Sequence, residues 1–302
     1  MLNDQRFHPG NIRIDPVHFL SKFHTTVDVL RLDLIHPVIS GNKWFKLKEY
    51  LAEAVLQNKK ILLTFGGAYS NHIVSTAAIA GFNRLKSIGI IRGEKPAILS
   101  HTLQNAINYG MEICFVSREH YRKKMVPKHI FNQHSENDTY IIDEGGYGEQ
   151  GVRGAKEILK QVDTSSYSHI IDAVGTGTTI SGLIQSSNPD QCITGISIFK
   201  NNYALQGAIE KFLSKTDKAR LVLIHDYHFG GYAKYTKQLI DFMNEWYSLT
   251  GIPSDFVYTG KLFFAVKDLL DKNYFPQKTK ILIIHSGGLQ GNQSLPNGTL
   301  IF

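Results

Sequence analysis

The sequence of 302 residues has only two cysteines and no hydrophobic run close to the roughly 20 residues that a membrane-spanning helix needs. Cys114 and Cys192 lie far apart and form no C-x-x-C pair, which excludes a disulfide framework and a cysteine metal site. The start of the chain also lacks the apolar stretch of a signal peptide. These absences predict a cytoplasmic protein that binds no membrane.

Charged residues make up only 20% of the chain, and its net charge of +7 is not gathered into one basic motif. The densest basic patches, residues 118–128 and 211–220, are mixed with acidic or apolar residues. Proteins that bind nucleic acids instead gather Lys and Arg on one face or in a tail. The sequence therefore predicts a solvated basic surface and no nucleic-acid partner.

The 13 histidines form no familiar metal-binding pattern, because there is neither a His-Glu-x-x-His motif nor a Cys/His quartet. The only compact cluster, residues 225–228, follows an expected strand. It is more typical of a loop with partly exposed imidazoles than of a zinc site. We therefore expect no metal ion in this protein.

Hydrophobic residues make up 42% of the chain and occur in short runs that alternate with amphipathic stretches. Several runs are continuous Ile, Leu and Val segments, which is typical of parallel strands covered by helices on both faces. The expected strands are 27–34, 61–65, 88–91, 113–116, 140–142, 170–174, 194–198, 220–224 and 281–285. The expected helices are 44–56, 71–81, 100–109, 150–161, 178–186, 205–213, 233–250 and 260–270. This order predicts an α/β protein with mostly parallel sheets, two lobes and a cleft between them.

Four segments at the ends of expected strands carry residues suited to chemistry, and the first is Gly41-Asn42-Lys43. A lysine at the start of a helix is unfavourable, because the positive end of the helix dipole disfavours cations there. In a cleft of low dielectric constant its pKa would fall, which would supply a neutral amine for Schiff-base chemistry. A plain surface lysine is the alternative for this segment taken alone.

The second segment runs from an expected strand through Gly66 and Gly67 into the helix that begins near Ser70. Glycines allow a ligand to approach the backbone, and the first free amides of a helix bind anions. Ser70 is well placed to cap the helix, which would be a purely structural role. Its hydroxyl and the neighbouring amides could still bind a carboxylate, so the two roles are compatible.

The third and fourth segments also follow apolar strands. Residues Gly175, Thr176, Gly177, Thr178 and Thr179 form a turn whose amides and hydroxyls could hold a phosphate without a lysine counter-ion. The turn lacks Gly-Lys-Ser/Thr and the full G-x-G-x-x-G spacing, so it is not a nucleoside-triphosphate loop. The fourth segment places Ser286 at the carboxyl end of a strand, where ligands of α/β proteins gather. Each turn could also be an ordinary glycine-rich connection.

Together these segments suit one cofactor, pyridoxal 5′-phosphate. The sequence resembles the tryptophan-synthase-β-like fold, which is fold type II of the pyridoxal-phosphate enzymes. Within that fold it resembles the 1-aminocyclopropane-1-carboxylate (ACC) deaminase / D-cysteine desulfhydrase family, over nearly the whole chain. The resemblance is most specific at Gly41-Asn42-Lys43, Gly66-Gly67, Ser70-Asn71, Ala77-Ala78, Tyr258-Thr259-Gly260-Lys261 and His285-Ser286-Gly287-Gly288.

The resemblance implies a role for each of these residues. Lys43 would be the Schiff-base lysine, and Asn71 would contact the 3′ oxygen of the cofactor. Ser70, Asn71 and His72 would bind the carboxylate of a small amino-acid substrate. Tyr232 and Tyr258 match the active-site tyrosines of the family, although each could also be a core aromatic residue. The phosphate would lie on Gly175–Thr179 and the pyridine nitrogen against Ser286.

The resemblance also implies the domain organisation. Residues 1–47 and 156–302 would form the larger cofactor-binding domain, and residues 48–155 a smaller inserted α/β domain. We expect a homodimer.

Two positions bear on the substrate. Family members that open ACC carry an acidic residue directly after the tyrosine that matches Tyr258, and a leucine at the position of Ser286. This chain has Thr259 and Ser286, and the members that act on D-cysteine tend to carry hydroxyl residues at both places. We therefore expect α,β-elimination of D-cysteine to pyruvate, ammonia and sulfide. The alternatives are deamination of ACC to 2-oxobutanoate, or cofactor binding without catalysis.

Overall fold

The computed structural model describes residues 7–21 and 25–302. The start of the chain, where we expect no signal peptide, lies outside the described residues, as do residues 22–24 of the predicted larger domain. The strands are β1 Ile14–Pro16, β2 Thr26–Arg31, β3 Ile61–Gly66, β4 Lys86–Arg92, β5 Met111–Val116, β6 Thr139–Ile142, β7 His169–Val174, β8 Cys192–Ser197, β9 Leu221–Ile224 and β10 Lys280–His285.

Most of the α-helices come from the predicted amphipathic stretches. The α-helices are α1 Asn42–Leu56, α2 Asn71–Phe82, α3 His101–Asn108, α4 Arg118–Arg122, α5 Lys128–Gln133, α6 Glu149–Ala155, α7 Thr178–Ser186, α8 Ala204–Glu210, α9 Lys215–Lys218, α10 Lys237–Thr250 and α11 Thr259–Asp271. The short helices α4, α5 and α9 lie outside the predicted stretches. Over residues 7–21 and 25–302, no helix has the length and apolar character needed to cross a bilayer.

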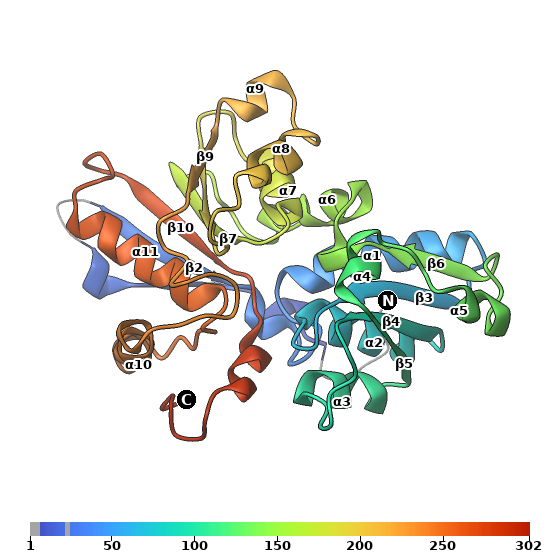
Figure 1. Cartoon of the computed structure of the whole chain (residues 1–302). Coiled ribbons are helices and arrows are strands. Elements are labelled where there is room, and N and C mark those ends of the chain that lie inside the picture. The colour runs from blue at the N-terminus through green and yellow to red at the C-terminus, as the bar shows by residue number, and fades with distance from the viewer. Residues whose placement is uncertain (1–6, 22–24) are drawn as a thin grey trace.

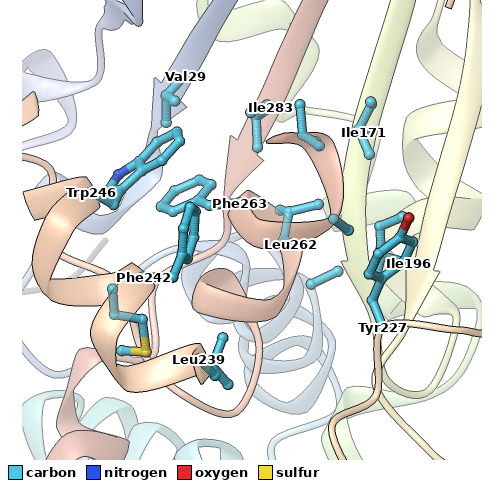
Figure 2. Packing of buried hydrophobic residues seen from close by; sticks show 14 of the residues in the cluster. Val29, Ile171, Ile196, Tyr227, Leu239, Phe242, Trp246, Leu262, Phe263 and Ile283 are labelled. Carbon is cyan, nitrogen blue, oxygen red and sulfur yellow. The ribbon is translucent and has the colours of Figure 1, made fainter. Parts of the chain in front are cut away.

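The larger sheet has six strands in the order β1-β2-β10-β7-β8-β9, and all its pairs are parallel except β1 with β2. Its strands are apolar on both faces because helices cover both. Ile171 of β7 packs into the cluster with α10 and α11, whereas Ile170 packs into the cluster with α7 and α8. Figure 2 shows the first cluster, where the rings of Trp246 and Phe263 stack with their centroids 4.3 Å apart.

The smaller sheet has four parallel strands in the order β5-β4-β3-β6, shown in Figure 1 beside α2 and α3. Helices α1, α2 and α3 cover one face, and α4 and α5 cover the other. All four strands fall within the range 48–155 predicted for the smaller domain. Helix α1 crosses the predicted boundary at residues 47 and 48, so the boundary itself stays a prediction. The predicted α/β fold with mostly parallel sheets covered on both faces is confirmed.

The differences from the predicted elements have local causes. Helix α10 begins at Lys237 rather than at residue 233, because Gly230, Gly231 and Ala233 have positive φ angles of 94°, 120° and 53° that no helix accepts. The helix predicted over 150–161 ends at Ala155 and resumes only as a 3-10 turn, Leu159–Gln161. Strand β1, a three-residue edge strand that ends in proline, is too short to give an alternating pattern.

Candidate active site

A cavity of about 550 Å³ lies at the carboxyl ends of the parallel strands, where segments from both sheets meet. Such a volume is typical of small-molecule sites. Among the predicted site residues, it is lined by Lys43, Ser70, Asn71, His72, Gly175, Thr176, Gly177, Thr179, Tyr232, Tyr258 and Ser286. Thr178 is fully buried and does not line the cavity, and its hydroxyl lies 3.1 Å from the hydroxyl of Thr176. One cavity thus collects residues from all four predicted segments.

Lys43 lies in the first turn of α1, which packs directly on the loop after β10. Gly41 has a φ of +61°, and a Cβ there would overlap the carbonyl of Ser286, so only glycine fits this junction. The ammonium of Lys43 donates to Asn42 Oδ1 over 2.8 Å. The amide of Asn42 in turn donates to Thr179 Oγ1 over 2.9 Å, which connects the lysine to the turn after β7.

The surroundings of Lys43 favour its neutral amine. Burial lowers the pKa of Lys43 to about 8, although the charges of Asp172 and Asp255 oppose this shift. The direction is the one expected for a lysine in a cleft of low dielectric constant. A substantial fraction of Lys43 would therefore be uncharged just above neutral pH, as a nucleophilic amine requires.

The start of α2 forms an anion-binding corner of the cavity. Ser70 is the N-cap residue, yet its side chain makes no capping hydrogen bond, so the hydroxyl is free to meet a ligand. The first amides of a helix also lack intrahelical partners. Asn71 is held on the other side, where its Oδ1 accepts a hydrogen bond from Gln290 over 2.9 Å and its Nδ2 donates to the Gly288 carbonyl over 3.4 Å.

His72 lines the cavity as a neutral imidazole. Thr64 Oγ1 donates to the carbonyl of Ile142, so the proton in its 2.9 Å contact with His72 Nε2 must come from the histidine. His72 Nδ1 is then an acceptor, and it is buried without a hydrogen-bond partner among the described residues. Burial holds the pKa of His72 well below its usual range, and the charges of Lys46, Lys43 and Lys124 lower it further.

The turn after β7 approaches the cavity with its backbone. Gly177 has a φ of +86° and is the N-cap of α7. A Cβ at Gly177 would overlap Ile209 of α8. A larger residue there would therefore displace the turn itself rather than fill the space of a ligand.

The two predicted tyrosines lie together above this turn. The Tyr232 ring stacks on Phe199 at 5.4 Å and meets the ring of Tyr258 edge-on at 6.1 Å. The loop that leads to Tyr232 is fixed by Lys261, which donates to the carbonyls of His228 and Gly231. Burial raises the pKa of both tyrosines, that of Tyr258 well above its usual value, so both hydroxyls are proton donors.

The hydroxyls of Ser286 and Thr259 differ in access. Ser286 lines the cavity, and its hydroxyl makes no hydrogen bond to the described residues. Thr259 is fully buried and lies outside the cavity lining. Its hydroxyl donates to Asp255 Oδ1 over 2.8 Å and accepts from the Asp255 amide over 2.7 Å. Only Ser286 can therefore offer its hydroxyl to a ligand.

Comparison with known proteins agrees with this geometry. No family model matches the chain. A relative from Thermotoga maritima with the name "Putative 1-aminocyclopropane-1-carboxylate deaminase" is 30% identical over 307 residues, which cover 93% of this chain and 96% of the relative. The chain belongs to the ACC deaminase / D-cysteine desulfhydrase family.

A second relative in this family is the "Bifunctional D-cysteine desulfhydrase/1-aminocyclopropane-1-carboxylate deaminase, mitochondrial" of Arabidopsis thaliana. It is 29% identical over 297 residues, which cover 88% of this chain and 73% of the relative. A solved structure described as an ACC deaminase homologue superposes with a TM-score of 0.81 at 26% identity, and covers 93% of this chain and 90% of its own. The predicted family and its type II fold are thereby confirmed, and the chain belongs to a family of pyridoxal-phosphate enzymes.

Four residues of charged types that line the cavity were not predicted from the sequence: Lys46, Arg92, Glu144 and Asp172. Lys46 lies one helical turn after Lys43, a spacing that places both on one face of α1 and could have identified it. Lys46 is thus a second lysine in the cavity, beside Lys43, whereas we expected the phosphate turn to have no lysine counter-ion. Asp172 could have been noticed as the one acidic residue within the apolar run of β7. Among the described residues, no group of three His, Cys, Asp or Glu could hold a metal ion, including the cluster 225–228.

Proposed function

We propose that this chain binds pyridoxal 5′-phosphate and catalyses α,β-elimination on a small amino acid, with D-cysteine as the leading substrate. The observation that carries the proposal is the position of Lys43. Its amine, with a pKa lowered to about 8, lines the same cavity as an uncapped helix start and a glycine-rich turn. A carbonyl-bearing anion and a carboxylate need these three features side by side.

The residues present fit this cofactor. Its phosphate would bind to the amides and hydroxyls around Gly175–Thr179, and its aldehyde carbon would meet Lys43. Asn71 would contact the 3′ oxygen, and the free hydroxyl of Ser286 would face the ring nitrogen. The cofactor, once bound, supplies the electron sink for the reaction. The backbone of Gly288 lies directly against the Asn71 side chain, since a Cβ there would lie 2.8 Å from Asn71 Nδ2, and this contact supports the position of Asn71 at the cavity wall.

The protein groups would then bind the substrate and move its protons. The Ser70 hydroxyl and the amides of Asn71 and His72 would hold the substrate carboxylate at the start of α2. The neutral amine of Lys43 would take the proton from the α-carbon. Tyr258, which its raised pKa keeps protonated, would assist as an acid at the departing sulfur. We also propose that Tyr232 positions Tyr258 through their edge-on contact.

The positions of the Ser286 and Thr259 hydroxyls, one lining the cavity and one buried outside it, support D-cysteine over ACC as the substrate. A serine at the ring nitrogen is a neutral partner, so it does not favour protonation of the ring and gives a weaker electron sink. Elimination of sulfide from a β-carbon needs less of that sink than opening a cyclopropane. A glutamate at position 259 would have to sit against the buried Asp255 carboxylate, which Thr259 now hydrogen-bonds. Deamination of ACC stays the second candidate, because relatives carry that name.

A substrate panel tests the proposal. The purified holoenzyme should release sulfide and pyruvate from D-cysteine faster than it forms 2-oxobutanoate from ACC, with D-serine and L-cysteine as further substrates. Lys43→Ala should keep the fold, bind the cofactor only non-covalently and lose roughly 10²–10⁴-fold or more in rate. Borohydride reduction and mass spectrometry should place the phosphopyridoxyl group on Lys43. An enzyme that opens ACC efficiently and ignores D-cysteine would overturn the substrate, and an adduct on another lysine would overturn the site.

A protein that binds the cofactor without catalysis is the remaining alternative, and the presence of Lys43 argues against it. We also propose a homodimer in the cytoplasm. Light scattering of the purified chain would measure its oligomeric state, and fractionation of cells would measure its location.

A further inference from the structure

Strand β7 carries a buried carboxyl group that nothing in the described structure satisfies. Asp172 is 1% exposed, and neither of its side-chain oxygens has a hydrogen-bond partner among the described residues. Its strand neighbours Ile171 and Ala173 are buried and apolar. A buried carboxyl without a partner is costly, so its presence at the wall of a ligand cavity calls for a role with the ligand in place.

The groups that face Asp172 come mainly from α1. Side chains alternate along a strand, so Asp172 shares the face of Ile170 and Val174, which pack with Phe45 of α1. Lys43 and Lys46 project from α1 into the same cavity, and their charges act on the Asp172 carboxyl. Neither lysine comes within 4.0 Å of the carboxylate to form an ion pair among the described residues. Lys46, only 3% exposed, also makes no hydrogen bond there.

The other walls add one further carboxylate, that of Glu144, which pairs with Lys124 over 2.6 Å. Helix α2 contributes His72, which is neutral. Its Nδ1 has no hydrogen-bond partner among the described residues and can only accept a hydrogen bond. Asp255, the other carboxyl whose charge acts on Lys43, lies outside the cavity lining. Within the described cavity wall, Asp172 and Glu144 are therefore the two carboxyl groups, and Tyr258 lies with Lys43, Lys46 and His72 among the titratable groups near the turn at residues 175–179.

A phosphate dianion bound to that turn changes the electrostatic balance at Asp172. The anion attracts the two lysines and repels the carboxylate, so it favours the protonated form of the carboxyl. A neutral carboxyl can donate its O–H to an acceptor, whereas an ionised one can only accept. No donor among the described residues stabilises the ionised Asp172 carboxylate by a hydrogen bond, so no such bond opposes its protonation when the cavity is occupied.

We propose that Asp172 couples anion binding to proton uptake: its carboxyl is ionised in the empty cavity, where it faces Lys43 and Lys46, and takes one proton from solvent when a phosphate group binds. This inference rests on the proposed function for the place of the phosphate. Asp172 is thus a positioning residue that acts through the charge of the cavity. Burial raises the pKa of Asp172 to about 7, while the backbone amide of Ala173 and the charges of both lysines oppose the shift, so the uptake occurs near neutral pH.

Sulfate tests the proposal, because it remains a dianion from pH 6 to pH 9 while phosphate titrates in that range. Isothermal titration calorimetry of the full chain, freed of cofactor, should show sulfate binding with about one more proton taken up by the wild type than by Asp172→Asn. The affinity of the wild type should fall more steeply with pH above 7, by up to tenfold per pH unit for the one additional proton. Asp172→Asn should bind sulfate more tightly at pH 8, with a flatter profile.

Glu144→Gln is the matched control. Glu144 lines the cavity and pairs with Lys124 over 2.6 Å, so this variant removes a negative charge without removing the carboxyl of β7. It should leave the number of protons unchanged. An equal proton uptake in wild type and Asp172→Asn would overturn the inference.

Two further measurements keep the test decisive. If Asp172→Asn does not fold, proton uptake by the wild type is measured in buffers of different ionisation enthalpy, and a value of zero overturns the inference. Lys43 and Lys46, whose pKa values are also lowered, can contribute to a positive value. If pyridoxal 5′-phosphate binds to the wild type with no proton uptake, only the role of Asp172 fails. If neither sulfate nor pyridoxal 5′-phosphate binds at any pH, the proposed function fails as well.

Discussion

Two buried carboxyl groups act on Lys43, and the protein treats them in opposite ways. Asp255, in the loop between α10 and α11, is 0% exposed and accepts hydrogen bonds from the amides of Val257, Tyr258 and Thr259 and from the Thr259 hydroxyl. Asp172, in the middle of β7, is nearly as buried and accepts none among the described residues. The two carboxyl groups are almost equally buried, but only that of Asp255 accepts hydrogen bonds from the described residues.

Asp255 therefore has a structural role in the site, whereas we infer that Asp172 acts when a ligand is bound. The four donors around Asp255 come from one short loop, and they fix the backbone that carries Tyr258 into the cavity. Asp172 sits in a strand that is paired with β8 and β10. The nearby amide of Ala173 lowers the pKa of the carboxyl, but it does not reach hydrogen-bond geometry. A carboxyl in that position gains a hydrogen-bond partner only from a group that enters the cavity, or it loses its charge by taking up a proton.

The largest effect on stability should come from Asp255→Asn. The new amide would point a donor at backbone amides that are themselves donors, and would leave one or more of them unsatisfied. We expect the free energy of unfolding to fall by about 2–4 kcal/mol, measured by urea denaturation. Tyr258 would lose its position, so activity should fall as well.

Thr259→Val is the control for this prediction, because it removes the hydroxyl that both donates to Asp255 and accepts from its amide. It should cost less than Asp255→Asn, about 1–3 kcal/mol. If Asp255→Asn were as stable as the wild type, Asp255 would not be the group that holds this loop.

The fold was largely readable from sequence for a physical reason. Strands covered on both faces must be continuously apolar, so β3, β7 and β10 stand out as runs of Ile, Leu and Val. The exceptions are short or depend on backbone conformation. The start of α10 is set by the positive φ of Ala233, which no propensity of alanine predicts.

The site was readable where chemistry falls in a local motif, and only in part elsewhere. Lys43, Ser70 and Ser286 stand at ends of strands or starts of helices, where parallel topology brings side chains together. The burial of the Thr259 hydroxyl could not be predicted from the sequence, because it depends on hydrogen bonds with Asp255, a residue outside the family motif. The influence of the Lys46 charge on Asp172 joins residues 126 positions apart, so it arises only once α1 packs on β7.

A smaller effect on stability, with a distinct dependence on pH, should follow from Asp172→Asn. The pKa of Asp172 is about 7 in the folded chain against 3.8 for the ordinary carboxyl. Between these values the folded state holds more protons than the unfolded state, so the wild type loses stability as pH rises from about 4 to 7. The asparagine variant lacks this loss. Relative to the wild type it should gain on the order of 1–3 kcal/mol between pH 5 and pH 8.

Urea denaturation of both proteins at pH 5 and pH 8 measures this gain. The buried amide of asparagine has its own cost, but that cost does not change with pH, so only the difference between the two pH values matters. Equal differences in wild type and variant would mean that Asp172 does not change its charge between them.

The smallest effect should appear at Lys43 itself, where the two carboxyls act together. Both raise the pKa of Lys43 against the larger effect of burial, and Asp172 is the stronger of the two. Removing the charge of Asp172 makes the cation less favourable, so in Asp172→Asn the pKa of Lys43 should drop below about 8. In the chain freed of cofactor, the rate of acylation of Lys43 against pH, followed by mass spectrometry of the Lys43 peptide, reports this pKa. The midpoint should move to lower pH in Asp172→Asn and stay in place in Glu144→Gln. A midpoint that does not move in Asp172→Asn would show that the carboxyl of β7 is already neutral when Lys43 titrates, and would leave Asp255 as the only carboxyl that tunes the lysine.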